Sequence, residues 1–291
     1  MRTDVLSAAR GRVAILELVE TESAEASREF AALTTEIARA NKGQVTIANT
    51  AIAPMILPDE NQPGSDDPVR LLLITNYETV EDAKIALSKR EESGAEGART
   101  SLRSYALKPL GRIESFMTRR VPYLLGLGRR VPLPHAENPE ELRAEIEGAL
   151  ILGEQPDKER WVRLVERAGA RPIWMLNFLD FAKAAVYAAQ EPNATAHAPT
   201  SGAIAYRKYG SGMISSLGAV GGRVGWGGQM LGQLSGDDDG KWNQVAIAVY
   251  PSAAAMMTML ALPKYRAAHV HRAAALARTR LLATQPLEGQ P

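Results

Sequence analysis

The sequence contains no cysteine, and this absence removes several kinds of site at once. Disulfide bonds, thiolate-bound metals and cysteine nucleophiles are all excluded, which fits a reducing compartment. Only four histidines are present, and two of them, His269 and His271, lie two residues apart on an expected helix, where their rings diverge. We therefore expect no metal site and no cofactor.

Excess charge and long apolar runs are missing too. The 34 Lys and Arg residues balance 33 Asp and Glu, so the net charge of +1 offers nucleic acid or an anionic membrane no overall field. No segment approaches the roughly 20 apolar residues of a spanning helix, and residues 1–12 lack the apolar stretch of a signal peptide. We expect a cytoplasmic protein without stable membrane insertion and without a nucleic-acid partner.

One basic segment, residues 99–130, departs from this balance. Its only acidic residue is Glu114, and it encloses the apolar run VPYLL. Such a segment can contact a membrane surface, a nucleic acid or a partner subunit, and binding of that kind would depend steeply on salt. More often it packs on its own protein with the charges turned outward.

Apolar segments of the first half follow the order strand, helix, strand, strand, helix, strand. Residues 13–19 (VAILELV) are branched and apolar, as is typical of a strand, and Phe30, Leu33 and Ile37 then recur at helical spacing. The other expected elements are strands at 45–52, 69–75 and 110–117 and a helix at 78–88.

The second half repeats this order. Residues 172–179 predict a strand, and a helix carrying Tyr206 and Met213 ends near Gly218. In the strand at 223–231, alternation places Val224 and Trp226 on one face, and the turn at 235–240 leads into a partner strand at 242–250. Helices at 253–262 and from 264 toward 282 follow, with a weakly signalled closing strand at 281–286.

The middle of the chain differs in composition. Residues 119–135 are rich in Pro and Gly, as linkers are, whereas 138–152 and 157–168 predict two helices that bridge the repeats. The expected organisation is a first repeat at 1–118, a linker with bridging helices at 119–170 and a second repeat at 171–291.

The second half also resembles a known family. The resemblance rests on the runs 174–178, 221–223, 242–251 and 262–265, on Tyr206 and Tyr209, and on His271 followed by Arg272. These are similar to an uncharacterised bacterial branch of the dimeric α/β-barrel superfamily, which includes antibiotic-biosynthesis monooxygenases, EthD-like proteins and chlorite dismutases. In that superfamily two ferredoxin-like units face each other through their sheets. The resemblance implies that two such units within one chain close the barrel internally.

Physical reasoning favours the same α+β architecture. A four-stranded antiparallel sheet with its helices on one face leaves the other face bare, and Trp226 and Trp242 are too apolar to leave in water at about 25 cal/mol per Å². The sheet of the first βαββαβ repeat is the nearest cover. Incomplete filling between two curved sheets would leave a ligand cavity.

Three candidate catalytic residues share one stripe of the helix from 264. Tyr265, His269 and Arg272 lie at i, i+4 and i+7, and no acidic residue follows them before 282. Histidine titrates near neutrality and arginine binds carboxylates, so the stripe can hold an anion or move a proton. A solvated basic helix face with one packed tyrosine is the alternative.

Four further residues are candidate ligand contacts. Asn177 interrupts an apolar strand, where it would orient a ligand carbonyl or tie down a loop, and Tyr206 is expected in the core with Tyr209 at the rim. Arg223 at a strand entrance can meet an acidic ligand or form a surface ion pair, and Trp226 faces the covering sheet.

The glycines between 218 and 228 do not indicate a nucleotide site. They end a helix and run into a strand, whereas a dinucleotide fingerprint needs glycines after a strand and before a helix. Close approach of another backbone or a ligand to a bulged strand is the better interpretation.

The sequence thus supports three hypotheses. The first is a small-molecule-binding protein, or a cofactor-independent enzyme, acting on an apolar or aromatic metabolite. The second is a non-catalytic assembly or regulatory module whose inter-sheet space is filled by side chains. A haem-dependent protein, or one associated with nucleic acid or membrane, is a remote third, and pairing into a homodimer is left open.

Overall fold

The computed structural model describes residues 2–56, 71–93, 101–124, 130–132, 158–188, 199–237 and 240–288. After a short 3-10 helix η1 (Thr3–Ala8), the first half contains β1 (Val13–Glu20), α1 (Ala24–Ala40), β2 (Gly43–Ile56), β3 (Leu71–Tyr77), α2 (Val80–Glu92) and β4 (Ser101–Pro109). The helices α3 (Arg112–Leu124) and α5 (Lys158–Ala168) follow. The second half contains β5 (Ile173–Phe181), α6 (Gly202–Ala219), β6 (Arg223–Ser235), β7 (Gln244–Tyr250), α7 (Ala253–Ala261), α8 (Pro263–Ala275) and β8 (Leu276–Pro286).

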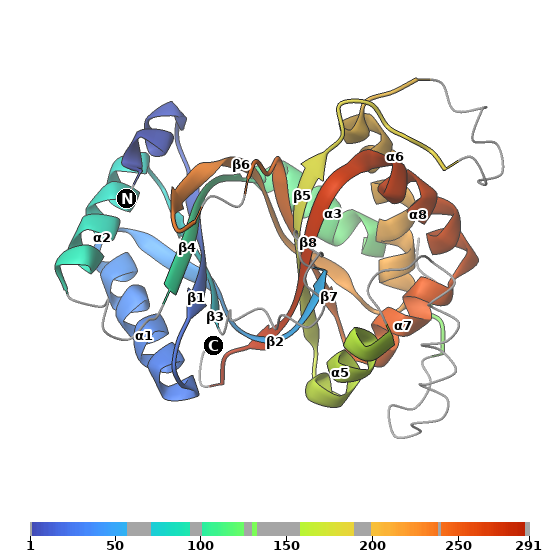
Figure 1. The fold of residues 1–291 in the computed structure, drawn as a ribbon, viewed down its shortest axis with the longest axis horizontal. Helices are drawn as coiled ribbons and strands as arrows, with labels where there is room; N and C mark the ends of the chain where they lie inside the picture. Colours follow the sequence, from blue (N-terminus) through green and yellow to red (C-terminus); the bar gives the residue numbers. More distant parts are fainter. Residues whose placement is uncertain are drawn as a thin grey trace.

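The eight strands form one closed antiparallel barrel in the order β1-β3-β2-β8-β5-β7-β6-β4. Each half supplies four consecutive positions, and the pairs β2–β8 and β4–β6 join the halves. Figure 1 shows the barrel in the middle, with α1 and α2 outside one wall and α6, α7 and α8 outside the other. The predicted pair of ferredoxin-like units closing within one chain is confirmed.

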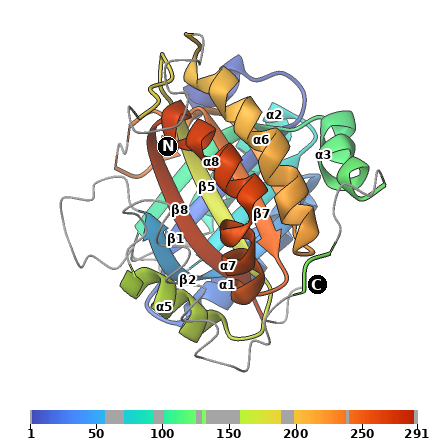
Figure 2. The same cartoon turned by 90° about the vertical axis from the view of Figure 1, so that its right-hand side faces the viewer.

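Strand alternation sorts the apolar residues into a barrel interior and two outer layers. Leu16, Leu72, Leu176 and Leu282 from both halves meet inside the barrel together with Trp226 and Trp242. A second cluster packs the outer face of β5, β7 and β8 against the helices of the second half, which Figure 2 views from that side. The two tryptophans are 8% and 6% exposed, so the first sheet covers them as expected.

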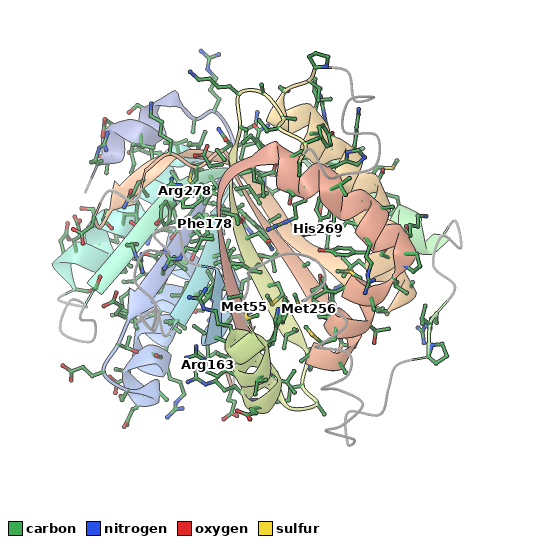
Figure 3. All side chains as sticks on the ribbon, turned by 45° about the vertical axis from the view of Figure 1, so that its right-hand side comes forward. Met55, Arg163, Phe178, Met256, His269 and Arg278 are labelled. Carbon is green, nitrogen blue, oxygen red and sulfur yellow. The ribbon has the colours of Figure 1, made fainter. Side chains whose placement is uncertain are left out.

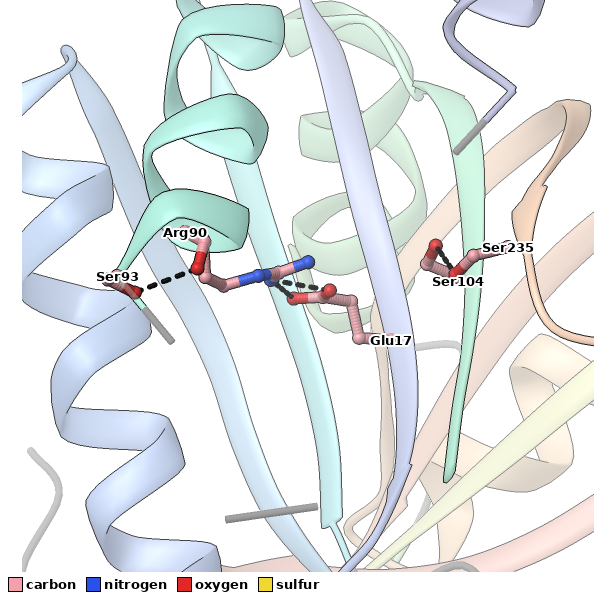
Figure 4. Close-up of polar contacts among 5 residues, drawn as sticks. All are labelled: Glu17, Arg90, Ser93, Ser104 and Ser235. Atoms are coloured by element: carbon pink, nitrogen blue, oxygen red, sulfur yellow. Dashed lines mark hydrogen bonds and ion pairs between the residues drawn. The ribbon is translucent and has the colours of Figure 1, made fainter. Parts of the chain in front are cut away.

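Polar contacts also fix the first half and the junction between the halves. Arg90 on α2 forms an ion pair with Glu17 on β1, with both side chains almost fully buried (Figure 4). Ser104 on β4 and Ser235 on β6 form a hydrogen bond of 2.6 Å across the junction. Burial alone would lower the pKa of Arg90, but the neighbouring Glu17 carboxylate raises it, and the net shift is upward.

Two predicted elements are wrong. The last strand of the first repeat is β4, Ser101–Pro109, and residues 110–117 belong mostly to α3. The Gly111 N–H donates to Glu114 Oε2 at 3.0 Å, a local contact that favours a helix start. The helix expected to run from 264 toward 282 ends at Ala275, because the chain from Leu276 pairs with β2 and β5 and closes the barrel.

A bulge changes one predicted face. The register of β6 against β7 shifts between Val224 and Trp226, so Trp226 points into the barrel while Val224 packs against the helix-side cluster. The helix expected at 138–152 and part of the turn at 235–240 lie outside the described residues, whereas the helix at 157–168 corresponds to α5. The predicted boundary after residue 118 falls within α3 and remains a prediction.

Candidate functional site

Arg272 on α8 is a half-buried cation that has no anionic neighbour among the described residues. Its guanidinium lies 3.5 Å from Thr279 Oγ1 on β8, and none of the described carboxylates forms an ion pair with it. Burial alone would lower the pKa of Arg272, but coupling to the hydroxyls of Tyr209, Tyr206, Tyr265 and Tyr250 raises it. The group therefore stays charged, surrounded by phenols instead of carboxylates.

Tyrosines from two helices and one strand build the walls around this cation. The ring centroids of Tyr206 and Tyr209 on α6 are 5.3 Å apart, and those of Tyr209 and Tyr265 on α8 are 6.2 Å apart. Burial raises the pKa of Tyr206 to about 12, although the charge on Arg272 opposes the shift. All these hydroxyls are thus protonated at neutral pH and can donate hydrogen bonds to an oxyanion.

His269 completes the cluster one turn before Arg272 on the same helix. Its ring centroid lies 5.6 Å from that of Tyr265, and Figure 3 places it where α8 faces the barrel wall. Burial, and then the charge on Arg272, lower the pKa of His269 to about 4. The imidazole is therefore neutral at pH 7 and has a nitrogen able to accept a proton.

Of the comparisons with known proteins, the one with solved structures gives matches. No family model and no curated protein matches the chain. Among solved structures, the RPA0582 protein of unknown function from Rhodopseudomonas palustris is 37% identical, and the match covers 96% of that protein and 47% of this chain, with a TM-score of 0.41. This chain belongs to the RPA0582 family.

More distant matches cover nearly the whole chain. A variant of chlorite dismutase from Candidatus Nitrospira defluvii is 13% identical over 99% of this chain and 97% of that one, with a TM-score of 0.41. An anthrone oxidase-like protein is 12% identical over 98% of this chain and 97% of that one, with a TM-score of 0.45. The closed barrel of two βαββαβ units in this RPA0582-family chain is itself the internally paired arrangement that the sequence resemblance implies.

The fold places six of the seven predicted site residues of this RPA0582-family protein in two groups, and Asn177 belongs to neither. Tyr265, His269 and Arg272 share a face of α8, and Tyr206 joins them from α6. Arg223 and Trp226 instead line a cleft at one end of the barrel. No single pocket between the sheets therefore unites the whole set.

Asn177 takes a structural position beside the first group. By alternation with Leu176 and Phe178 inside the barrel, it lies on the helix side of β5. Its amide nitrogen donates to the carbonyl of Met175 at 2.9 Å and is 3.5 Å from that of Ala246 on β7. The amide thus forms its hydrogen bonds within its own sheet, to strand carbonyls and not to a loop.

Sequence reasoning missed part of the tyrosine cluster. Tyr209, expected at the rim, is buried, and Tyr206, expected in the core, is half-buried. Tyr250 was not singled out, although alternation along β7 puts it on the helix-side face next to the Ser252 cap of α7. The alternation of residues along this strand is therefore a sequence pattern that places Tyr250 on the helix-side face.

Histidine geometry in the described part of the RPA0582-family chain gives no metal centre. His271 Nδ1 lies 2.9 Å from the hydroxyl of Tyr187, so its ring turns away from the cluster around Arg272. No group of three or more His, Cys, Asp or Glu side chains gathers within the described ranges. None of the helices in these ranges is long and apolar enough to cross a membrane.

Proposed function

We propose that the protein binds a small aromatic or apolar metabolite with an ionisable oxygen, held between α6, α8 and the barrel wall of the second half. The observation that carries this is Arg272: a charged guanidinium with only one weak hydrogen bond, to Thr279, and no carboxylate partner among the described residues. Unpaired charges are costly away from water, so an anionic ligand is the natural partner.

The walls of this site suit an aromatic ligand. Tyr206, Tyr209 and Tyr265 contribute ring faces and edges, and Phe181 extends the row, with its centroid 5.3 Å from that of Tyr206. Arg272 and Tyr206 are both half-buried, so the site is not sealed by the described residues. A planar acid can stack on these rings while its oxygen meets the guanidinium.

His269 adds a hydrogen-bond acceptor to the same site. Because the imidazole is neutral at pH 7, one of its nitrogens can accept a hydrogen bond from a bound phenol, and the charge of Arg272 favours the ionised form of the ligand's oxygen. We propose on this basis a cofactor-independent enzyme, in which Arg272 stabilises an anion formed on the substrate and His269, beside Tyr265, accepts a hydrogen bond that orients the substrate hydroxyl.

The binding proposal is tested with 4-hydroxybenzoate as probe, titrated by calorimetry. We expect Arg272→Gln to weaken binding at least about tenfold, because one charge-assisted contact contributes about 1.5–3 kcal/mol. Arg207→Gln is the matched control: Arg207 is exposed on the neighbouring helix α6, and its loss should leave the affinity unchanged. Equal affinity in the folded Arg272→Gln variant and the parent protein would contradict the proposal.

A non-catalytic assembly module is favoured by one observation. The space between the two sheets is filled by apolar side chains of both halves, among them Leu16, Leu176 and Phe178, all nearly inaccessible. The filling stops short of one end of the barrel, however, where a cleft of about 510 Å³ is left. A purely structural interior does not need such a cleft.

A further inference from the structure

The cleft at the end of the barrel is built by both halves. Its lining includes Arg12 before β1, Asn76 near the end of β3, and Trp174, Arg223 and Trp226 at the starts of β5 and β6. With a volume of about 510 Å³ it falls within the range of small-molecule pockets. It lies inside the ring of strands, on the opposite side of β5 from the cluster around Arg272.

Two tryptophans give the cleft an aromatic wall. Trp226 belongs to the interior cluster, with Trp174 packed at its margin, and the bulge in β6 is what turns Trp226 inward. Gly228 lets this ring lie along the strand, because a Cβ at that position would be 2.7 Å from Trp226 Cη2. The glycine-rich start of β6 therefore serves to place an indole in the cleft.

Arginine side chains lie at the opening of this cleft. The Arg223 guanidinium lies 5.8 Å from the centroid of the Trp174 ring, and the Arg12 side chain is 38% exposed. An adjoining pocket of about 380 Å³ shares Arg12 and adds Arg10 and Lys108. Arg12 forms one long ion pair, its Nε 3.9 Å from the exposed carboxylate of Glu78, and Glu114 accepts a hydrogen bond from the Gly111 N–H. An exposed ion pair of this length contributes little, so a ligand carboxylate can compete with Glu78.

Two polar atoms of the lining are buried and make no hydrogen bond to any of the described residues. These are Arg12 Nε, a donor, and Asn76 Oδ1, an acceptor. The orientation of the Asn76 amide is fixed by Thr46. The Thr46 hydroxyl donates to the Ile74 carbonyl, so it accepts a hydrogen bond from Asn76 Nδ2 at 3.0 Å, and Asn76 Oδ1 points elsewhere. Buried polar groups are normally paired, so the lining has hydrogen-bonding capacity that the described part of the chain does not use.

We infer that this cleft is a second binding site, separate from the one around Arg272, and that it takes a planar aromatic acid. The ring of the ligand packs against Trp174 and Trp226, and its carboxylate lies between Arg12 and Arg223. A planar aromatic acid can contact both the tryptophan rings and the arginines of the cleft. A neutral aromatic molecule would contact only the tryptophans, and a small inorganic anion only the arginines.

The inference is tested with 4-nitrobenzoate, whose nitroaromatic ring quenches tryptophan fluorescence, and with the neutral 4-nitrobenzamide of the same shape. We expect the carboxylate to bind at least about tenfold more tightly than the amide, as charge-assisted hydrogen bonds to arginine would give. In Arg12→Gln and Arg223→Gln that preference should fall at least about tenfold, while amide binding persists.

Arg28→Gln is the control for exposed cations: it removes an exposed arginine near the start of α1 and should leave the quenching by 4-nitrobenzoate unchanged. Arg272→Gln removes the cation of the proposed site on the far side of β5, and it shows which of the two sites the quenching probe occupies. The inference is overturned if Arg12→Gln and Arg223→Gln retain the parent's preference for the carboxylate, or if Arg28→Gln abolishes it equally. Loss of quenching in Arg272→Gln alone would assign the carboxylate to the other site and overturn it too.

Discussion

At the scale of single residues, His269 makes the stability of the fold depend on pH. Its pKa is about 4 in the folded protein against an ordinary 6.5, so between these values the unfolded chain binds a proton that the native protein does not. The free energy of unfolding should therefore fall as pH drops through this window, by about 2–3 kcal/mol once partial solvent access is allowed for.

Urea unfolding at pH 7.5 and pH 4.5 measures this loss, and His269→Gln should reduce it because glutamine does not titrate. Groups elsewhere titrate equally in both proteins, so the difference between the two losses isolates the histidine. An NMR titration of the His269 ring gives the pKa directly. A value near 6.5 in the folded protein would contradict the argument.

The sequence predicts some of these residues together and not others, for a physical reason. Helical spacing alone puts Tyr265, His269 and Arg272 on one face, since residues three and four apart are neighbours on any α-helix. Tyr250 comes from a strand, and its place beside them depends on pairing that joins β7 to β5. Trp226 faces the covering sheet as expected, but the bulge in β6 separates it from Val224, which packs on the helix side, and local alternation does not show this bulge.

At the scale of elements, local pattern predicts most helices and strands and fails where long-range pairing decides. The sequence pattern does not indicate β4, because Arg103 and Lys108 interrupt its apolar residues. The strand forms because it pairs with β1 on one side and β6 on the other. The sequence predicts a helix over the first residues of β8, because the alanines before Leu276 are followed by residues that a helix also accepts. In both cases barrel closure outweighs local propensity.

The packing of α6 on α8 offers a test at this scale. A Cβ at Gly212 would lie 2.5 Å from the Cβ of Ala268, and neither atom can move by changing rotamer. Gly212→Ala should therefore separate the two helices and lower the free energy of unfolding by about 1–3 kcal/mol. Thermal and urea unfolding measure the change.

Gly210 on the same helix is the matched control, because nothing lies within 4 Å of a Cβ built there. Gly210→Ala should stabilise the protein by about 0.5–1 kcal/mol, since alanine loses less backbone entropy than glycine in a helix. Equal effects of the two substitutions would mean that α6 and α8 are not in the close contact described.

At the scale of the whole molecule, the two halves share one interior. The physical need to cover a bare sheet predicts that they pack together, and the resemblance to dimeric barrels supplies the way in which they do so. The registers of β2 on β8 and of β4 on β6 were beyond prediction, because pairs more than a hundred residues apart leave no local pattern. These two seams join the halves into one barrel.

Phe178 tests whether the halves unfold as one unit. Its ring, inaccessible in β5, lies with its centroid 5.1 Å from that of Tyr105 in the first half and 5.5 Å from that of Trp242 in the second. Phe178→Ala should cost about 3–5 kcal/mol and raise hydrogen exchange in β1 and β3 as well as in β5, because opening the shared interior exposes both walls. Phe116→Ala, at a site on α3 that is 54% exposed, should change stability by less than about 0.5 kcal/mol. If exchange rose only in the second half, each unit would be stable without its partner, and the closed barrel would be an association of two domains instead of one cooperative fold.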